Sequence, residues 1–498
     1  SVYRARQAGL TYVAPAAGGA TSTEERLPGH RFDLDSVAHN MINMTDIIQD
    51  LALEECGLEY LEMDPFSTMF TPAGQAVRFY RDLERTCDEI ARVDPAEARR
   101  YRGFIRTYDP LILASTSMFR RNGRRDLLRA LPGVARWWRR AGAWGAMGEL
   151  FSSYGRLLDS CCETQWMKAG LAALAAHATV GPDMPGGAYY VMWQAAYHRY
   201  GMWHARGGSG ALAEALQRRL QSYGGKVITN AEVVSLEVQG SAVAGLRVKF
   251  SSGGSDVVEA PVVITTVNPK TVLTEWLPEQ ALSRELRRHV SAARTANVVQ
   301  FIIHIAASQL PRYRGTEGMH DAWNGMAAMS HSLDQISLGF RQSELGLIPD
   351  DPGVYIFTPS AIDQTLCASG SHTVYLACPT FPGRLAPGCW AEEGLRAAER
   401  LVAQVEAYAP GFKRSITAMR PYTPAEMEKA VGLLNGHPMH LSLDQSQLLL
   451  MRPVPALGSH RTPIRGLYLS GAGTAPSGGV LGIPGRRAAQ AVLRDARA

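Results

Sequence analysis

The chain has 498 residues, of which 46% are hydrophobic and 19% are charged. This composition excludes an intrinsically disordered protein, and the length exceeds that of one compact core, so we expect two domains. There are 51 lysines and arginines against 46 aspartates and glutamates, and the resulting net charge of +5 is too small to indicate a nucleic-acid-binding protein.

The seven cysteines contain no Cys-x-x-Cys pair, and the 13 histidines show no metal-binding spacing. The sequence therefore indicates neither a disulfide framework nor a zinc site, and we expect no metal. It contains no signal-peptide pattern and no apolar run long enough to span a bilayer, so we expect a cytoplasmic protein with reduced thiols.

The first part of the chain mixes short strands with helices. Residues 11–36 predict a strand, a glycine turn at Gly18-Gly19 and an extended segment. Apolar residues recur at helical spacing over residues 45–57, which predicts a helix. Residues 78–108 predict one or two charged amphipathic helices.

Residues 119–150 stand out by their charge. They hold eight arginines and three tryptophans, balanced only by Asp126 and Glu149. A basic amphipathic stretch with tryptophans is typical of a helix that lies on a membrane surface. The alternative is a solvated arginine face over an ordinary core. We expect Pro132 and Gly133 to interrupt the helix.

The middle of the chain predicts a helix followed by strands. A helix over residues 208–223 ends at Gly224-Gly225, and strands are predicted at 226–229, 231–238, 243–250 and 257–266. Residues 271–454 alternate strands, such as 298–306, 353–358 and 373–378, with helices, such as 390–408. This second region indicates a sheet backed by helices.

The C-terminal end carries the strongest signal in the sequence. An apolar strand within residues 466–474 runs into Gly471-Ala472-Gly473, and further glycines lead into a helix at residues 482–489. Glycine allows a backbone to approach a ligand closely, and a helix start offers free N–H groups. The pattern predicts a ligand site; the alternative is an ordinary strand-to-helix turn.

Several segments together resemble one family. They are residues 18–25 and 28–33, residues 206–212, residues 439–445, Arg452-Pro453, and the C-terminal glycine segment, in which Ser477 replaces a usual glycine. The chain resembles the phytoene desaturase family of flavin amine-oxidase-like oxidoreductases over nearly its whole length. It is most similar to the bacterial and mitochondrial branch described as pyridine nucleotide-disulphide-oxidoreductase-like.

The resemblance implies an α/β fold with a discontinuous Rossmann-like FAD-binding domain and an α+β substrate domain. The flavin domain would comprise residues 1–45, 205–275 and 455–498, and the substrate domain residues 46–204, which are largely helical, and 276–454. The family opens with a Gly-x-Gly-x-x-Gly fingerprint and an acidic residue after the second strand. Here residues 1–10 look like the end of the first helix, and residues 14–17 stand where the acid belongs. Either residues are absent from this chain, which we favour, or the fingerprint has been lost.

The resemblance also implies site residues. It implies that FAD is held by Gly18, Gly19, Ala20, Thr21, Val233, Thr265, Gly471, Ala472, Gly473, Gly479, Val480 and Gly482, with the Val233 backbone against the adenine. Candidate catalytic residues are Asp444, Arg452, His440 and Arg199, and a buried Arg452–Asp444 pair would order its segment in any case. Tyr197, His198, Tyr200 and Trp203 are candidate substrate contacts, with a packed domain junction as the alternative. His437 and His440 are weighed for a catalytic role, with a structural role as the alternative.

These features favour an FAD-dependent oxidoreductase that desaturates or oxidises a hydrophobic isoprenoid, polyene or polyketide-like substrate by hydride transfer. The alternative is a flavin-fold protein that has lost FAD, acting as an isomerase or cyclase, or as a non-catalytic lipid-binding or assembly partner. We expect peripheral membrane contact through residues 119–150 and no nucleic-acid partner, and the oligomeric state stays open. Gly473→Val or Gly479→Val should abolish flavin retention while the protein stays folded.

Overall fold

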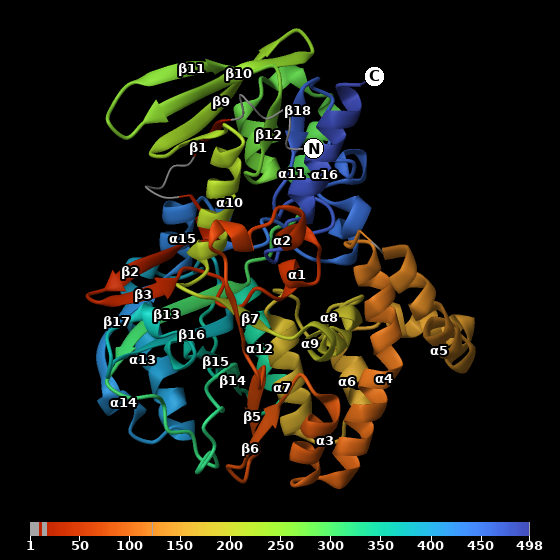
Figure 1. The fold of residues 1–498 in the computed structure, drawn as a ribbon, viewed down its shortest axis with the longest axis vertical. Helices are drawn as coiled ribbons and strands as arrows, with labels where there is room; N and C mark the ends of the chain where they lie inside the picture. Colours follow the sequence, from red (N-terminus) through yellow and green to blue (C-terminus); the bar gives the residue numbers. More distant parts are fainter. Residues whose placement is uncertain (1–8, 12–16, 122, 498) are drawn as a thin grey trace.

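The computed structural model describes residues 9–11, 17–121 and 123–497, and its largest element is a seven-stranded mixed sheet in the lower part of Figure 1. The strand order is β17-β13-β16-β15-β14-β5-β6. The strands are β5 (Ser67–Phe70), β6 (Ala76–Phe79), β13 (Val299–Ala307), β14 (Met326–Met329), β15 (Val354–Phe357), β16 (His372–Phe381) and β17 (Ile416–Tyr422). All neighbours are antiparallel except β14 and β5. The residues before Gly9, where the end of a helix was expected, and residues 14–16 lie outside the described part.

Helices cover both faces of this sheet. Alternate residues of β13 point to opposite faces, so Phe301 and Ile303 pack with α13 (Trp390–Tyr408) while Ile302 joins the core on the other side. That other core includes α7 (Gln165–Ala176) and α12 (Leu333–Glu344). Short helices α14 (Phe412–Ser415) and α15 (Pro424–Val431) flank β17 in the chain.

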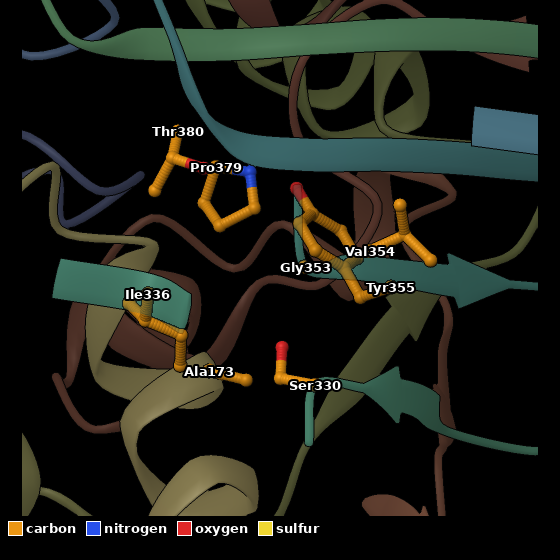
Figure 2. Close-up of a pocket in the computed structure, with 8 residues that line it drawn as sticks. All are labelled: Ala173, Ser330, Ile336, Gly353, Val354, Tyr355, Pro379 and Thr380. Atoms are coloured by element: carbon orange, nitrogen blue, oxygen red, sulfur yellow. The ribbon is translucent and has the colours of Figure 1, made fainter. Parts of the chain in front are cut away.

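The core between helices and sheet is closely filled. Figure 2 shows a cavity between α7, α12 and the sheet whose volume is about 10 Å³. That volume is at the lower limit for a single water molecule. This cavity is therefore too small for a substrate.

A group of helices forms the right-hand side of Figure 1. They are α3 (Leu83–Ala91), α4 (Pro95–Ser117), α5 (Gly123–Phe151), α6 (Tyr154–Cys161), α8 (Ala188–Met192) and α9 (Gln194–Tyr200). The side chains of Asp82, Asp94 and Ser153 cap α3, α4 and α6, as N-cap residues should. The expectation for residues 78–108 was therefore right about two helices but missed strand β6 at its start.

The expected break in α5 was wrong in position. The helix runs through Pro132, and its backbone leaves helical geometry at Gly142, which has φ 70° and ψ 165°. A Cβ on Gly133 would lie 2.4 Å from the Pro110 ring of α4. Gly133 therefore serves close packing of α5 against α4.

The upper part of Figure 1 contains the smaller sheets. β1 (Gly9–Thr11) pairs in parallel with β8 (Lys226–Ile228), and β12 (Val263–Thr265) pairs in parallel with β18 (Leu467–Leu469). β9 (Ala231–Gln239), β10 (Ala242–Phe250) and β11 (Ser255–Glu259) form an antiparallel meander. The helices here are α10 (Gly210–Ser222), α11 (Arg284–Ala292) and α16 (Ile483–Asp495). The single strand expected over 257–266 is two strands, because Pro261 lies between them and has no N–H to donate.

Short elements connect the upper and lower parts. They are the hairpin β2 (Thr23–Leu27) and β3 (His30–Asp33), the pair β4 (Tyr60–Glu62) and β7 (Trp203–Ala205), and the helices α1 (Asn40–Asn43) and α2 (Ile47–Asp50). The helix expected over 45–57 was wrong in length, because Ala52 has a left-handed φ of 47° and ends it. Of the helices within the described ranges, none combines the length and apolarity needed to cross a bilayer.

Candidate functional site

The C-terminal glycine loop, residues 471–482, follows β18 directly. Ser470 N donates to Thr265 O at 2.8 Å, which fixes the start of the loop beside β12. Gly471, Gly479 and Gly482 have φ of 76°, 94° and 71°, a region that favours glycine. Val480 also has a positive φ, 55°, and β-branched residues rarely adopt such a backbone outside functional segments.

The loop packs against apolar side chains that precede it in the sequence. A Cβ on Gly479 would lie 2.4 Å from Met41 Sδ, and one on Gly482 would lie 2.6 Å from Ile47 Cδ1. A Cβ on Gly473 would lie 2.4 Å from the Pro269 ring. Valine at position 473 or 479 would therefore collide with the protein itself. These two variants would thus strain the loop as well as fill space beside it, so they do not separate flavin binding from loop stability.

The loop ends at the free N-terminus of α16. Gly482 is the N-cap residue, and no side chain caps the helix. A Cβ on Gly485, in the first turn, would meet nothing within 4 Å. In the first turn of this thirteen-residue helix, Ile483 and Gly485 carry a backbone N–H and Pro484 does not, and the dipole is positive at this end. Such an end suits a phosphate or an electron-rich ring edge.

Arg452 is the buried centre that holds the loop in place. Its Nε donates to Ala472 O at 2.9 Å, Nη1 donates to Ser442 O and Gln447 O, and Nη2 donates to Met439 O and Leu441 O. All five guanidinium N–H donors are therefore used. Burial lowers the pKa of Arg452 to about 10, so it stays charged at neutral pH.

The expected pairing of Arg452 with Asp444 was wrong. Asp444 Oδ1 instead accepts from Ser446 N at 3.0 Å and caps a short 3-10 turn. Carbonyl oxygens occupy every donor of Arg452, so the guanidinium has none left for a carboxylate. Arg452 and Asp444 therefore position the chain, and Arg452 has no donor left for a cofactor.

The other two candidate catalytic residues lie in different surroundings. His440 is next to the loop, its Cβ 3.5 Å from the position of a Cβ on Gly473, and its buried Nδ1 has no partner among the described residues. Burial, helped by the charge of Arg452, lowers the pKa of His440 to about 4, so the ring is neutral at pH 7. Arg199 forms a partly exposed ion pair with Asp109 and is tied to α4.

The four candidate substrate residues have their polar and aromatic groups engaged. Tyr197 stacks on Phe66, with ring centroids 5.2 Å apart. His198 Nε2 lies 2.7 Å from the Tyr101 hydroxyl, and the Tyr200 hydroxyl lies 2.7 Å from Thr116 Oγ1. Trp203 Nε1 donates to Tyr200 O. This geometry matches the packed-junction alternative.

The remaining predicted cofactor residues are spread over three segments. Gly18, with φ 146°, accepts through its carbonyl from Thr21 Oγ1, and Gly19 and Ala20 continue this turn. Val233 lies in β9, where it pairs with Val248. Thr265 pairs with Leu469 across β12 and β18 and so lies at the start of the glycine loop.

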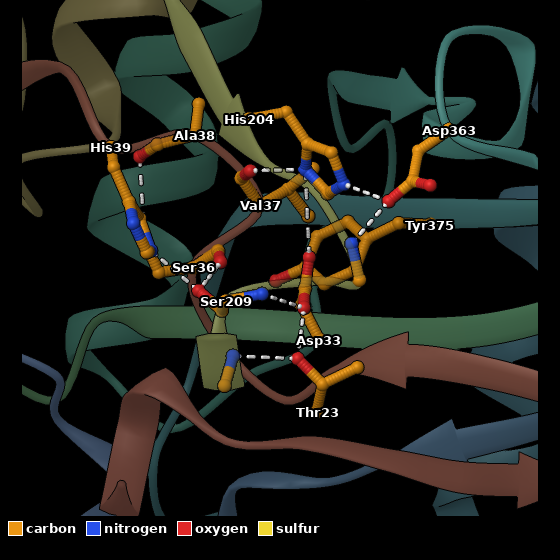
Figure 3. Close-up of polar contacts among 12 residues, drawn as sticks. Thr23, Asp33, Ser36, Val37, Ala38, His39, His204, Ser209, Asp363 and Tyr375 are labelled. Atoms are coloured by element: carbon orange, nitrogen blue, oxygen red, sulfur yellow. Dashed lines mark hydrogen bonds and ion pairs between the residues drawn. The ribbon is translucent and has the colours of Figure 1, made fainter. Parts of the chain in front are cut away.

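A buried polar cluster, which the sequence did not reveal, joins several of these segments (Figure 3). Three N-terminal amides of the α10 region are held by side chains. Gly207 N donates to Asp363 Oδ2 at 2.7 Å, Ser209 N to Asp33 Oδ1 at 2.6 Å, and Gly210 N to Thr23 Oγ1 at 2.8 Å. The backbone N–H groups of the middle glycine motif therefore donate to the protein's own carboxylates and hydroxyl.

His204 lies between the two carboxylates of this cluster. Its Nε2 is 3.4 Å from Asp363 Oδ2 and its Nδ1 is 4.0 Å from Asp33 Oδ2, while Nδ1 also donates to Val37 O at 3.0 Å. Burial opposes the charged ring, but Asp363 and Asp33 outweigh it and raise the pKa of His204. Burial raises the pKa of Asp33, whereas the hydrogen bonds to Asp363 outweigh burial and lower its pKa.

His39 extends the cluster towards the glycine loop. Its Nε2 lies 2.5 Å from Ser209 Oγ, which itself donates to Ser36 O, so His39 donates from Nε2 and accepts from the Tyr60 hydroxyl at Nδ1. Burial lowers the pKa of His39 to about 3, so it is neutral. Since α1 begins one residue later and carries Met41, the cluster fixes one wall of the glycine loop. The motif at residues 28–33 contains Asp33, but no sequence signal marks Asp363 or His39.

Comparison with known proteins shows which family the chain resembles. Residues 178–327 match the model of the flavin containing amine oxidoreductase family. Pyridine nucleotide-disulfide oxidoreductase domain-containing protein 2 of Mus musculus is 30% identical over 96% of this chain and 87% of its own length. A limonene dehydrogenase component from Castellaniella defragrans is 25% identical over 96% and 88%. Phytoene desaturase (lycopene-forming) of Pantoea ananas is 24% identical over 88% and 83%.

The fold has solved counterparts as well. An oxidoreductase from Methanosarcina mazei superposes with a TM-score of 0.60 at 14% identity, covering 99% of this chain and 96% of that one. The chain therefore belongs to the flavin amine-oxidase-fold family that includes pyridine nucleotide-disulfide oxidoreductase domain-containing protein 2 and the phytoene desaturases. It is a member of a flavin-containing oxidoreductase family, as its sequence predicted.

The residues present fit a flavin at the C-terminal glycine loop. An extended anionic cofactor would lie against the uncapped N-terminus of α16 and in the open space at Gly485. The positive φ of Val480 is a backbone strain of the kind found at ligand sites. Gly471, Ala472, Gly473, Gly479, Val480 and Gly482 belong to this loop. The stretch in which the ribose-binding acid was expected lies mostly outside the described residues.

Proposed function

We propose that the protein is an FAD-dependent oxidoreductase that removes a hydride from a carbon of a hydrophobic, isoprenoid-like substrate. The observation that carries the proposal is the glycine loop. Arg452 links this loop to residues 439–447 by hydrogen bonds, and the loop ends at a helix with no side-chain cap. When bound, FAD accepts a hydride from a substrate C–H bond, and the protein supplies binding, orientation and electrostatics.

The chemistry of the loop's surroundings supports an apolar substrate. Met41 and Ile47 touch the loop from one side, and a Cβ on Gly478 would lie 2.8 Å from Met439 Sδ on another. His440, whose Cβ lies 3.5 Å from the position of a Cβ on Gly473, is neutral at pH 7. The atoms nearest to a Cβ on Gly473, Gly478, Gly479 or Gly482 are all carbon or sulfur atoms, which suits a hydrocarbon better than a cationic amine. Apolar walls would orient a hydrocarbon chain by shape alone.

The resemblance implied a discontinuous flavin domain. We infer that residues 1–45, 205–275 and 455–498 form it and that the rest forms the substrate domain. Pairing of β12 with β18 and the hydrogen bond from Ser209 N to Asp33 support this division, since each joins two of the three segments.

The test is anaerobic reduction of the protein-bound flavin. Purified full-length protein, loaded with FAD, would be mixed with an acyclic isoprenoid hydrocarbon in detergent and, separately, with putrescine. We expect bleaching of the flavin absorbance by the isoprenoid and not by the amine. Bleaching by the amine alone would overturn the substrate class, and a protein that never binds flavin would favour the isomerase, cyclase or lipid-binding alternative.

A further inference from the structure

Helix α5 exposes apolar side chains on the outer edge of the molecule. Trp144 is 91% exposed, Leu128 65% and Phe151 53%. Figure 1 shows α5 beyond α4, at the right-hand margin. Single exposed apolar residues are ordinary, but several large ones on neighbouring helical segments mark an interaction surface; Leu128 precedes the break at Gly142, and Trp144 and Phe151 follow it.

The exposed residues are ordered in stripes along the helix. Asp126, Ala130 and Trp137 are buried, at spacings of four and seven residues. Leu127, Leu131 and Trp138 are each one position further on and are all exposed, so they form a second stripe beside the buried one. Arg125, Arg129 and Arg136 have the same helical spacing, four and seven residues apart, and all are exposed. The apolar stripe and the arginine stripe therefore lie on either side of the buried stripe, each about 100° from it, and the exposed Arg124 and Leu128 lie between them on the outward face.

The two acidic residues of the stretch are turned towards the protein. Asp126 is 9% exposed and pairs with Arg120 and Arg129 at 3.5 and 3.7 Å. Glu149 Oε2 accepts from Trp137 Nε1 at 2.7 Å and from the Tyr108 hydroxyl at 3.0 Å. In the described part of the chain, five arginines of the stretch have no carboxylate within ion-pair distance: Arg124, Arg125, Arg136, Arg139 and Arg140. The exposed side is therefore cationic.

We propose that the exposed side of α5 docks the protein on an anionic phospholipid bilayer. Cationic arginines complement anionic headgroups, leucines reach the acyl boundary, and tryptophans sit at the headgroup level. An anionic bilayer has an apolar acyl layer beneath its charged headgroups, so it can take up both the arginines and the large apolar side chains. A nucleic acid or an acidic protein surface would pair with the arginines and leave the apolar side chains exposed. The proposal goes beyond the oxidoreductase function and does not depend on a bound flavin.

Two ion pairs place the segment just before α5 close to the start of α16. Arg121, just before α5, pairs with Asp50 of α2, and Asp50 also pairs with Arg486 in the first turn of α16. A bilayer bound at α5 would therefore lie on the side of the molecule to which the glycine-loop helix is tied. A substrate that partitions into lipid would be presented near the site.

Vesicle flotation of the full-length protein tests the proposal. The vesicles would contain phosphatidylcholine alone or with about one quarter phosphatidylglycerol, at low and at high salt. We expect binding to the anionic vesicles at low salt, with at least about tenfold weaker binding at 0.5 M salt, because salt screens surface charges. The triple variant Arg136→Glu, Arg139→Glu, Arg140→Glu should lose at least about tenfold in affinity.

A matched control carries the same change of charge elsewhere. Arg218→Glu, Arg247→Glu, Arg396→Glu replaces three exposed arginines on other elements and should bind vesicles like the wild type. Trp144→Ser removes the most exposed tryptophan, which has no packing role, and should also weaken binding. Absence of wild-type binding at low salt, or equal binding by both triple variants, would overturn the proposal. So would retention on an acidic protein or nucleic acid without binding to vesicles.

Discussion

At the scale of single residues, Arg452 has the largest structural role near the candidate site. Five carbonyl oxygens from residues 439–447 and Ala472 depend on one side chain. A buried carbonyl without a partner costs on the order of 1–3 kcal/mol. The loop and its neighbouring segment should therefore lose their shape together when Arg452 is replaced.

Arg452→Lys keeps the charge but offers three donors in place of five, so at least two carbonyls lose their partner. We expect the free energy of unfolding to fall by about 3 kcal/mol and the flavin bound per chain to fall at least tenfold. Denaturant unfolding and flavin absorbance measure the two effects. Arg199→Lys is the control, because its partly exposed ion pair should contribute about 1 kcal/mol or less. A stable, flavin-replete Arg452→Lys protein would refute the role given to Arg452.

His204 gives a prediction with a defined pH dependence. Its pKa is raised above 6.5 in the folded protein, so its stabilising effect is complete below pH 6.5 and is lost as the pH rises through the folded pKa. His204→Gln should therefore destabilise more at pH 6 than at pH 9, by a margin of about 1–3 kcal/mol. Urea unfolding of both proteins at the two pH values measures the difference. An equal loss at both would mean that His204 is not charged in the fold.

At the scale of elements, a variant at Gly485 separates flavin binding from folding better than Gly473→Val or Gly479→Val. A side chain at Gly485 would meet no protein atom within 4 Å. Gly485→Val should keep the free energy of unfolding within about 1 kcal/mol, because the backbone there is helical. Its side chain would enter the space proposed for the cofactor, so we expect flavin affinity to fall at least tenfold.

The control for Gly485→Val is Gly103→Val, which places the same side chain on an exposed glycine of α4 with equally open surroundings. Both variants would be titrated with FAD and followed by flavin fluorescence. Unchanged FAD affinity in Gly485→Val would remove the α16 N-terminus from the site.

Some helices and strands could be predicted from the sequence and others could not. The helix at 390–408 was predicted with its observed bounds, because its apolar residues repeat at helical spacing and face one core. Strand β6 was missed because it depends on pairing with β5, and the break at Gly142 was missed because α5 contains several glycines and nothing in the sequence sets this one apart. Glycines marked the C-terminal loop. The partners of Arg452 could not be predicted, because backbone carbonyls leave no signal in a sequence.

At the scale of the whole molecule, buried neutral histidines predict sensitivity to acid. Burial lowers the pKa of His39 and His437 to about 3 and of His198 and His440 to about 4. An unfolded chain takes up protons on these rings near pH 6.5, so the folded state loses stability as the pH falls below that value. We expect a loss of at least about 3 kcal/mol between pH 7 and pH 5, since each ring contributes up to about 1.4 kcal/mol per pH unit. Urea unfolding at the two pH values measures it, and equal stability would contradict the burial of neutral rings.

The central claim is that the C-terminal glycine loop, held by Arg452, binds FAD. The most direct measurement is the stoichiometry and identity of the flavin in purified protein, before and after incubation with FAD, with released cofactor identified by mass. We predict one FAD per chain, with the absorbance bands of an oxidised flavin, and at least tenfold less in Arg452→Lys. Absence of flavin both as purified and after reconstitution of the full-length protein would contradict the account.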